Sequence, residues 1–535
     1  MEKGTLKNIF NLIKEKENKE SNRVNRFIQK IEMVEKIESN RPFTEDELNI
    51  KGDLDLSNSN ITYLPEGLNV GGNLFLTNCK SLTSLPEGLK VGGDLDLGNC
   101  TSLTSLPEGL EIGGNLYSRD CISLTSLLEG LEVGGDLTLI NSPIITISKG
   151  LKVGKQLKLI DCISLTSLPE GLKVRDLNLR GCTSLTSLPE GLKVGNNLYL
   201  IDCTSLKSYP AGLKVRDLDL RNCTSLTSLP EGLKVLGYLI LDNICSLTTL
   251  PEGLEVEGRL SLKNCTNLKL LPEGLEVRES LELTNCTSLT TLPEGLKVGG
   301  SLNLTNCTSL TYLPAGLKVV GSLTLQNCKS LTSLPDQLEI GGSLDLGNCK
   351  SLTSLPERLK VGNGLSLDNF RRLTSLPEGL EVRNIYLTNC TSLTSLPEGL
   401  KVLNRCHLRN CTSLTSLPEG LKVVGSLILT KSTNLTSLPE GLVVKENLDL
   451  TKCTSLTSLP EGLKVGQTLY LTNCTSLTSL PEGLKVEKNC YIKNTPIEKL
   501  SLGDIAKMIK KGYIKKWKDL TYIQNFLHSK NTLKK

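Results

Sequence analysis

Leucine positions along the chain follow a repeating pattern. A Leu-x-Leu pair, in which one variable residue separates two leucines, precedes a Leu-x-x-Leu-Pro segment, and the unit then begins again. Such an alternation is that of a short strand with two side chains inward and one outward. The Leu-Pro position recurs in 21 copies from Pro65 to Pro481, at steps of 20 or 21 residues, with Leu128 and Ser148 replacing proline in two copies. A fixed period of this length predicts a solenoid.

The rest of each unit predicts a return to the next strand without an α-helix. An Asn-Cys step follows the leucine pair, and we expect its asparagines to form a ladder from copy to copy. Proline and several glycines recur in the segment that follows, and both residues disfavour α-helix. We therefore predict one parallel sheet on the concave face and extended or short 3₁₀ structure on the convex side.

The 20-residue copies carry the clearest family resemblance. Residues 174–185 read L-x-x-L-x-L-x-x-C-x-x-L, with Val174 in the first leucine place, and 215–226 and 382–393 repeat this spacing. The pattern resembles the leucine-rich repeat. Most other copies insert one residue at a Gly-Gly step, which departs from the family pattern at the entry to the strand. The resemblance covers residues 50–494 and implies a leucine-rich repeat solenoid.

Two short segments flank the repeats, so three parts are predicted. Residues 1–49 form a helical N-terminal cap, in which Val24, Phe27, Ile28, Ile31 and Val34 fall on one helical face. Residues 50–494 form the repeat array. Residues 495–535 form a basic helical C-terminal cap, with one helix at 505–512 and a second from residue 514 to residue 527.

The C-terminal segment concentrates positive charge, because 495–535 holds 10 lysines against three acidic residues in a chain of net charge +4. The simplest interpretation is a cap with a solvated lysine face. The alternative is contact with an anionic membrane. Nucleic-acid binding is not favoured, since aromatic residues do not alternate with the lysines. The lysines concerned are Lys507, Lys510, Lys511, Lys515, Lys516 and Lys518.

Sixteen of the 19 cysteines occupy one place of the repeat, where other copies have Ile244, Phe370 or Ser432. This indicates a buried apolar position, because free cysteine behaves as a small hydrophobe. The spacing does not match zinc ligands or a disulfide framework. Reduced thiols favour the cytoplasm. Neither a signal peptide nor a stretch of 18 apolar residues is visible, and export by a signal that is not cleaved stays an alternative.

Catalytic residues, a metal site, a cofactor and a small-molecule substrate are not predicted. The chain has only His407 and His528, its Gly-Gly steps belong to the repeat, and its LPEG carboxylates are periodic. The repeats resemble those of secreted bacterial effectors of the LPX class, some of which add a ubiquitin-ligase domain with a nucleophilic cysteine. About 40 residues without cysteine follow the last repeat here, so the ligase activity is not carried over.

The residues between the paired leucines vary while the frame stays constant, which is typical of a binding face in this family. Exposed aromatic and arginine side chains are the ones that binding hot spots favour. The candidate partner-binding residues are Tyr386, Arg405, His407, Arg409, Tyr199, Tyr117 and Tyr470. In the neighbouring columns lie Asp53, Asp94, Asp136, Arg180 and Arg221. The alternative is neutral variation on a solvated face.

A sheet of 21 strands would be about 100 Å long, which suits a macromolecular partner. We therefore expect a non-enzymatic protein–protein interaction scaffold whose concave face binds a protein. One alternative is a secreted effector or substrate adaptor that recruits a partner to an enzyme. Another is a structural or adhesive surface repeat protein.

Overall fold

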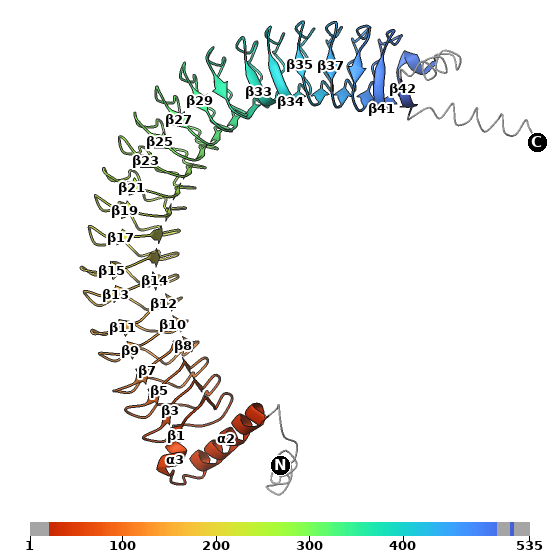
Figure 1. The fold of residues 1–535 in the computed structure, drawn as a ribbon. Coiled ribbons are helices and arrows are strands. Elements are labelled where there is room, and N and C mark those ends of the chain that lie inside the picture. The colour runs from red at the N-terminus through yellow and green to blue at the C-terminus, as the bar shows by residue number, and fades with distance from the viewer. Residues whose placement is uncertain (1–20, 500–513, 518–535) are drawn as a thin grey trace, which may run out of the picture. The chain divides into compact units, whose positions relative to one another are not determined.

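The computed structural model describes residues 21–499 and 514–517. It consists of two compact units, Met1–Gly258 (unit 1) and Arg259–Lys535 (unit 2). Each unit is a parallel β-solenoid, in which every repeat makes one turn (Figure 1). This confirms the predicted leucine-rich repeat solenoid.

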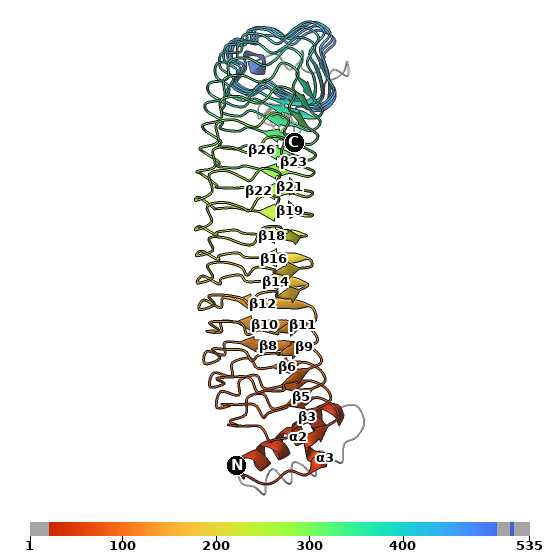
Figure 2. The same ribbon diagram turned by 90° about the vertical axis from the view of Figure 1, so that its left-hand side faces the viewer.

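The Leu-x-Leu pairs form a parallel sheet in each unit, here called the LxL sheet. Leu95 lies opposite Leu74 and Leu116, so leucine stacks on leucine from strand to strand. Within each unit this sheet follows the inner side of the bend, and in unit 1 the strands stack one above another (Figures 1 and 2). The LxL strands of unit 1 are β2 (Leu54–Asp55), β4 (Leu74–Phe75), β6 (Leu95–Asp96), β8 (Leu116–Arg119), β10 (Leu137–Ile140), β12 (Gln156–Ile160), β14 (Asp176–Asn178), β16 (Asn197–Tyr199), β18 (Asp217–Asp219) and β20 (Leu239–Ile240).

Unit 2 continues the same pattern with some longer strands. Its LxL strands are β22 (Leu260–Ser261), β24 (Leu281–Glu282), β26 (Leu302–Asn303), β28 (Leu323–Thr324), β30 (Leu344–Asp345), β32 (Gly364–Ser366), β33 (Glu381–Tyr386), β34 (Lys401–His407), β36 (Leu427–Ile428), β38 (Leu448–Asp449), β40 (Leu469–Tyr470) and β41 (Lys485–Tyr491).

A second row of parallel strands runs beside the first sheet, because the Lys-Val or Glu-Val step of most repeats also pairs with a neighbour. We call this row the KV sheet. The predicted return segment is thus extended, as expected, but it is also hydrogen-bonded between repeats. Its strands in unit 1 are β1 (Asn49–Ile50), β3 (Asn69–Val70), β5 (Lys90–Val91), β7 (Glu111–Ile112), β9 (Glu132–Val133), β11 (Lys152–Val153), β13 (Lys173–Val174), β15 (Lys193–Val194), β17 (Lys214–Val215), β19 (Lys234–Val235) and β21 (Glu255–Val256). In unit 1 the pairing is interrupted between β11 and β13 and between β15 and β17.

In unit 2 some strands belong to both sheets. The KV strands proper are β23 (Glu276–Val277), β25 (Lys297–Val298), β27 (Lys318–Val319), β29 (Glu339–Ile340), β31 (Lys360–Val361), β35 (Lys422–Val423), β37 (Val443–Val444) and β39 (Lys464–Val465), while β33, β34 and β41 span both sheets. A short 3₁₀ helix, η1 (Pro496–Lys499), follows β41.

Where a repeat has a Gly-Gly step, neighbouring turns lie close together. A Cβ atom on Gly92 would lie 2.3 Å from the carbonyl oxygen of Gly71, and one on Gly93 would lie 2.3 Å from Asn73 Oδ1. β33 and β34 lack this step, since Arg383 and Asn384 or Leu403 and Asn404 follow the valine. Their backbones continue as strand, with a register shift between Val382 and Asn384.

The asparagine ladder is confirmed, and its bonds join side chains rather than turn backbone groups. Asn306 Nδ2 donates to Asn285 Oδ1 at 2.7 Å, and Asn327 Nδ2 donates to Asn306 Oδ1 at 2.8 Å. These asparagines have left-handed backbone conformations, with φ of +63° at Asn306. Asparagine tolerates this region better than most residues, so one side chain supports both the turn and the stacking.

The repeated cysteine place is buried, as predicted, but it also contains a hydrogen-bond donor. Cys307 Sγ donates to the carbonyl oxygen of Leu283 at 3.1 Å. Ser432, which occupies the same place in its repeat, donates to the Leu408 carbonyl at 2.9 Å. Cys406 and Cys490 are buried in leucine places of the LxL sheet, opposite Leu427 and Leu469.

Helix α2 (Ser21–Glu38) lies against β2 at the start of unit 1, and a short helix, α3 (Glu45–Leu48), follows it (Figure 1). The buried face differs from the predicted one. Met33 and Ile37 are only 5% and 4% exposed, whereas Phe27 is 56% exposed. Residues four apart share a helix face, and the 33–37 face is the one that meets the first turn of the solenoid. The apolar pattern of the sequence alone does not show which face of the helix meets the solenoid.

The predicted helical C-terminal cap is wrong at residues 514–517. These residues form strand β42 (Ile514–Trp517), which pairs in parallel with β41 through Val486 and Ile514 and through Cys490 and Trp517. The last strand of an open sheet presents unpaired backbone groups, and pairing with them favours extended structure over helix. The helix predicted at 505–512 and the part of the second helix after 517 lie outside the described residues.

Candidate partner-binding surface

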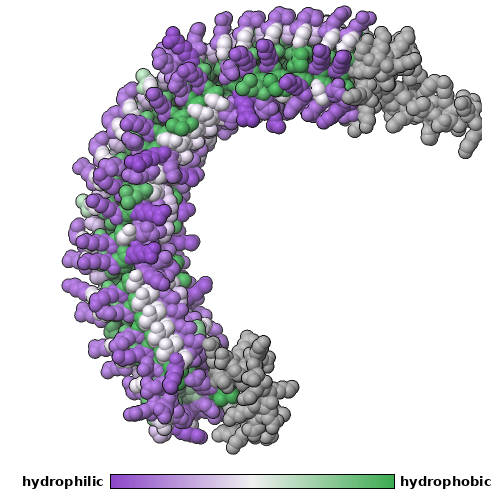
Figure 3. Space-filling model, viewed as in Figure 1, coloured by the Kyte–Doolittle hydropathy of each residue, from purple (hydrophilic) through white to green (hydrophobic). Residues whose placement is uncertain are grey.

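The outward side chains of the LxL sheet form the candidate surface. Hydrophilic residues cover most of the face shown in Figure 3. Many of the aspartates in this column have a structural role, because they accept a hydrogen bond from the backbone two residues later. Asp96 Oδ1 accepts from the Gly98 N–H at 2.9 Å, and Asp449 Oδ1 accepts from the Thr451 N–H at 2.9 Å. They close the end of the strand in the manner of an Asx turn.

The acidic flanking column also has a structural role. Asp53 Oδ1 accepts from the backbone N–H of Asn73 at 2.9 Å, and Asp94 Oδ1 accepts from that of Asn115 at 2.7 Å. Asp136 Oδ1 accepts from the Gln156 N–H at 3.2 Å. Each carboxylate therefore accepts a hydrogen bond from the next turn in the way that a backbone carbonyl does inside a sheet. These bonds lie where the LxL sheet begins. These hydrogen bonds account for the acidic residues of this column, and no binding partner is needed to explain them.

Tyr386, Arg405, His407 and Arg409, which we call the anchor cluster, lie on two adjacent strands and the turn that follows the second. Tyr386 of β33 is in register with His407 of β34. Their rings meet edge to face, with centroids 5.0 Å apart and planes at 82°. Arg405 and Arg409 lie two residues before and after His407 and are exposed. Arg405 and His407 are two apart in β34 and so share a face, while Arg409 lies in the turn after the strand. The charges of both arginines act on His407.

The electrostatics of the anchor cluster keep its imidazole neutral. Burial lowers the pKa of His407 below its usual value, and the charges of Arg409 and Arg405 lower it further, while Asp368 opposes them. The histidine is therefore uncharged at neutral pH. The positive charge of the cluster resides on the two guanidinium groups, and the ring pair is neutral.

The other predicted tyrosines are not brought together with the anchor cluster. Tyr470 of β40, in the same unit, stacks on Tyr491 of β41, with ring centroids 5.0 Å apart and planes at 1°. Tyr117 of β8 is 38% exposed in unit 1. Sequence reasoning missed Tyr491, although it lies in the same column one strand beyond Tyr470.

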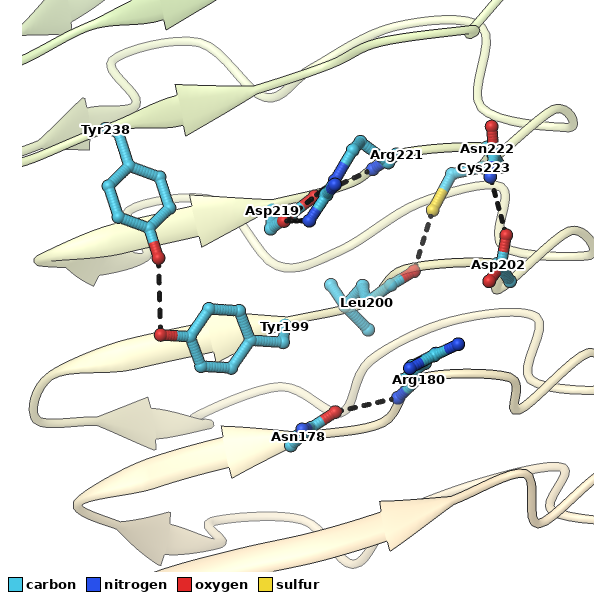
Figure 4. Close-up of polar contacts among 10 residues, drawn as sticks. All are labelled: Asn178, Arg180, Tyr199, Leu200, Asp202, Asp219, Arg221, Asn222, Cys223 and Tyr238. Atoms are coloured by element: carbon cyan, nitrogen blue, oxygen red, sulfur yellow. Dashed lines mark hydrogen bonds and ion pairs between the residues drawn. The ribbon is translucent and has the colours of Figure 1, made fainter.

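Tyr199 belongs to a separate polar group in unit 1 (Figure 4). The Tyr238 hydroxyl donates to the Tyr199 hydroxyl at 3.2 Å, across the strand that carries Asp219. Burial and this hydrogen bond raise the pKa of Tyr238. Tyr238 precedes the leucine pair of its repeat and so was not among the predicted residues.

Arg221 in the same group is already engaged. Its Nη2 lies 2.6 Å from Asp219 Oδ2, and its Nε lies 3.0 Å from both carboxylate oxygens. Asp219 is 2% exposed, and its hydrogen bonds raise the pKa of Arg221. Arg180 is different, because its side chain is exposed while its backbone N–H donates to Asn178 Oδ1 at 3.0 Å (Figure 4). Only Arg180 of this pair has an uncommitted guanidinium.

The profile of the BspA type leucine-rich repeat region matches residues 381–488, in six copies. The chain is a leucine-rich repeat protein. The matched leucine-rich repeats include β33 and β34 and therefore the anchor cluster. No curated protein shows a significant match to the chain. Leucine-rich repeats of this type suggest a role in protein interaction or as a surface repeat.

In residues 21–499 and 514–517, no group of three or more His, Cys, Asp or Glu side chains could hold a metal ion. None of the helices that the structure describes has the length and hydrophobicity needed to cross a membrane.

Proposed function

We propose that this leucine-rich repeat protein is a non-enzymatic scaffold that binds a protein partner through the anchor cluster. The observation that carries the proposal is the edge-to-face pair of Tyr386 and His407, with exposed Arg405 on the strand of His407 and exposed Arg409 in the turn that follows it. Tyrosine and arginine are enriched in binding hot spots because they combine large contact area with directed hydrogen bonds. The neutral ring pair supplies an apolar centre, and the arginines supply a charged rim.

The backbone beneath the cluster supports this role. β33 and β34 are continuous strands of six and seven residues, whereas most strands of the array have two. Five residues of β33 are in register with β34. A side chain held by a longer, paired strand loses less conformational entropy on binding, which favours affinity.

The experiment measures the affinity of two double variants for a partner protein captured from the native cell. Tyr386→Ala with Arg405→Ala should lower affinity by about thirtyfold or more for each true anchor, since a hot-spot truncation costs about 2 kcal/mol. The control is Glu398→Ala with Glu419→Ala, which alters exposed residues of the LPEG loops in the same unit. Equal losses in the two variants, or loss only in the control, would place the site elsewhere.

A structural or adhesive surface repeat is the second candidate, and the match to the BspA type repeat region favours it. An adhesive array would spread its contacts over many repeats. Its binding would then fall gradually as repeats are altered, and the anchor variant would resemble the control. A role as an effector or substrate adaptor would show the same anchor dependence, together with an enzyme in the captured complex.

We also propose that the protein works in the cytoplasm, which the cysteine array supports. Eighteen of the 19 thiols are buried, and Cys245 is exposed. Thiols in such numbers suit a reducing compartment. Contact of the C-terminal lysines with an anionic membrane stays a prediction, since most of them lie outside the described residues.

A further inference from the structure

In several parts of the KV sheet, a lysine and a glutamate on neighbouring strands form an ion pair. Lys90 Nζ lies 3.1 Å from Glu111 Oε1, and Lys360 Nζ lies 2.6 Å from Glu339 Oε1. Further pairs of this kind join Lys152 to Glu132, Lys234 to Glu255, Lys297 to Glu276 and Lys401 to Glu381.

Other lysines of the KV sheet lie in none of these ion pairs, and the longest run of them within the described residues is in unit 1. Strands β13, β15 and β17 present Lys173, Lys193 and Lys214 in succession, and no described residue forms an ion pair with any of the three. Lys173 lies directly opposite Lys193 in the paired strands β13 and β15, and Lys214 follows on the neighbouring strand β17. Paired strands lie about 4.8 Å apart, so three like charges follow one another. Like charges directly opposite each other destabilise a sheet. The arrangement is therefore unfavourable without an anion.

Neighbouring positions add positive charge. Arg175 and Arg216 are exposed and follow Lys173 and Lys214 by two residues. The LPEG glutamate is replaced by Lys149 in the repeat before the row and by Ala211 within it, while Glu170 and Glu190 remain before Lys173 and Lys193. Arg175 Nε forms a long ion pair with Asp176 Oδ2, at 3.9 Å.

The two ends of the row are neutralised by glutamates. Lys152 and Lys234, on the strands just before and just after, pair with Glu132 and Glu255. The three lysines without an ion pair thus lie in a narrow row, about 10 Å long from Lys173 to Lys214. We call Lys173, Lys193, Lys214, Arg175 and Arg216 the lysine strip.

We propose that the lysine strip binds an extended acidic polypeptide segment. A narrow row fits a single chain, whereas a membrane or a nucleic-acid duplex would need a broad basic face. A single nucleic-acid strand is normally held by aromatic stacking as well as charge. The exposed large aromatic residues of the described chain are Phe27, Tyr63, Tyr117 and Tyr312, and none of them lies on β13, β15 or β17.

Carboxylates on an extended chain recur on one side about every 6.6 to 6.8 Å. This carboxylate repeat is longer than the spacing between lysines on neighbouring strands. The flexible lysine side chains can bridge the difference. The strip lies on the KV sheet of unit 1, and the anchor cluster lies on the LxL sheet of unit 2, so this site is independent of the proposed function.

The test uses the full chain and fluorescein-labelled decaglutamate, with decaglutamine as the uncharged probe, followed by fluorescence anisotropy at low salt. The triple variant Lys173→Ala, Lys193→Ala and Lys214→Ala should bind decaglutamate about tenfold more weakly than the parent chain. The matched control, Lys90→Ala, Lys297→Ala and Lys360→Ala, removes the same charge from paired lysines of the same sheet. It should change affinity by less than about twofold.

Equal weakening in the two triple variants would show a general charge effect and overturn the proposal. So would an affinity for decaglutamate no higher than for decaglutamine in the parent chain. Tighter binding of oligothymidylate or phosphatidylserine vesicles through the same lysines would replace the acidic peptide as the ligand. Thermal unfolding separates binding from folding, because removing the strip lysines should leave the melting temperature unchanged or raise it. If the triple variant does not fold, Lys193→Ala alone should still show weaker binding.

Discussion

Asparagine and cysteine follow each leucine pair as neighbours, yet they stabilise different parts of the solenoid. Asn306 has a left-handed backbone and bonds to the asparagines of the adjacent repeats. Cys307 is fully buried and donates to a carbonyl of the preceding repeat. Gly181, with φ of +74°, replaces asparagine in one repeat, which indicates that the backbone conformation is the stricter requirement of the two.

Thiol reactivity should report the burial of the cysteine place. Burial raises the pKa of Cys411 and Cys349 to about 12, so the reactive thiolate is scarce at mildly alkaline pH. We expect iodoacetamide to label only Cys245 rapidly in the native protein, out of 19 cysteines. Mass spectrometry before and after unfolding in urea would count the labelled thiols.

The variant Cys245→Ser is the control for this experiment, and it should show almost no rapid labelling in the native state. Rapid modification of several thiols in the folded chain would mean that the cysteine place is open to solvent. Labelling should also stay slow as the pH rises to the range in which ordinary thiols ionise, because the raised pKa delays ionisation of the buried ones.

Elements at the ends of the array cover strands that the repeats themselves leave open. α2 packs against β2 through Met33 and Ile37, and β42 pairs with β41. Solenoids need such ends because each repeat buries its core only against its neighbours. Two different elements, a helix and a strand, meet this need here.

Alanine substitutions in α2 should distinguish its buried face from its exposed face. Ile37→Ala should destabilise the protein by about 2 to 4 kcal/mol, because it removes a buried side chain and leaves a cavity. Phe27→Ala, at a position that is 56% exposed, should change stability by less than about 0.5 kcal/mol. Urea unfolding monitored by circular dichroism would measure both. A larger loss for Phe27→Ala would mean that the helix is rotated on the first repeat.

The whole molecule is built from nearly equivalent turns, so its stability is a sum over neighbours rather than the property of one core. The described helices α2 and α3 have 18 and 4 residues. The far-ultraviolet circular dichroism spectrum should therefore be that of a β protein.

Removal of one complete turn should preserve the fold. Deleting residues 288–308 joins Thr287 to Ser309 and restores the repeat sequence without β25 and β26. Each remaining strand then meets an equivalent neighbour, so we expect an unchanged spectrum and a cooperative unfolding transition. Deleting ten residues of the same segment, which breaks the period, should unfold part of the array. Equal effects of the two deletions would contradict nearest-neighbour stabilisation.

The sequence by itself determined the solenoid, the leucine layers, the buried cysteines and the adjacency of Tyr386 and His407. All of these follow from a local period that places equivalent residues on neighbouring strands. Tertiary structure decided the features that depend on which partner lies beside a group. Asp94 accepts a bond from Asn115, the KV step becomes a sheet, and residues 514–517 pair as a strand instead of forming a helix. Hydrogen bonds between repeats require a specific register and distance, and a one-dimensional pattern of polar residues does not contain either.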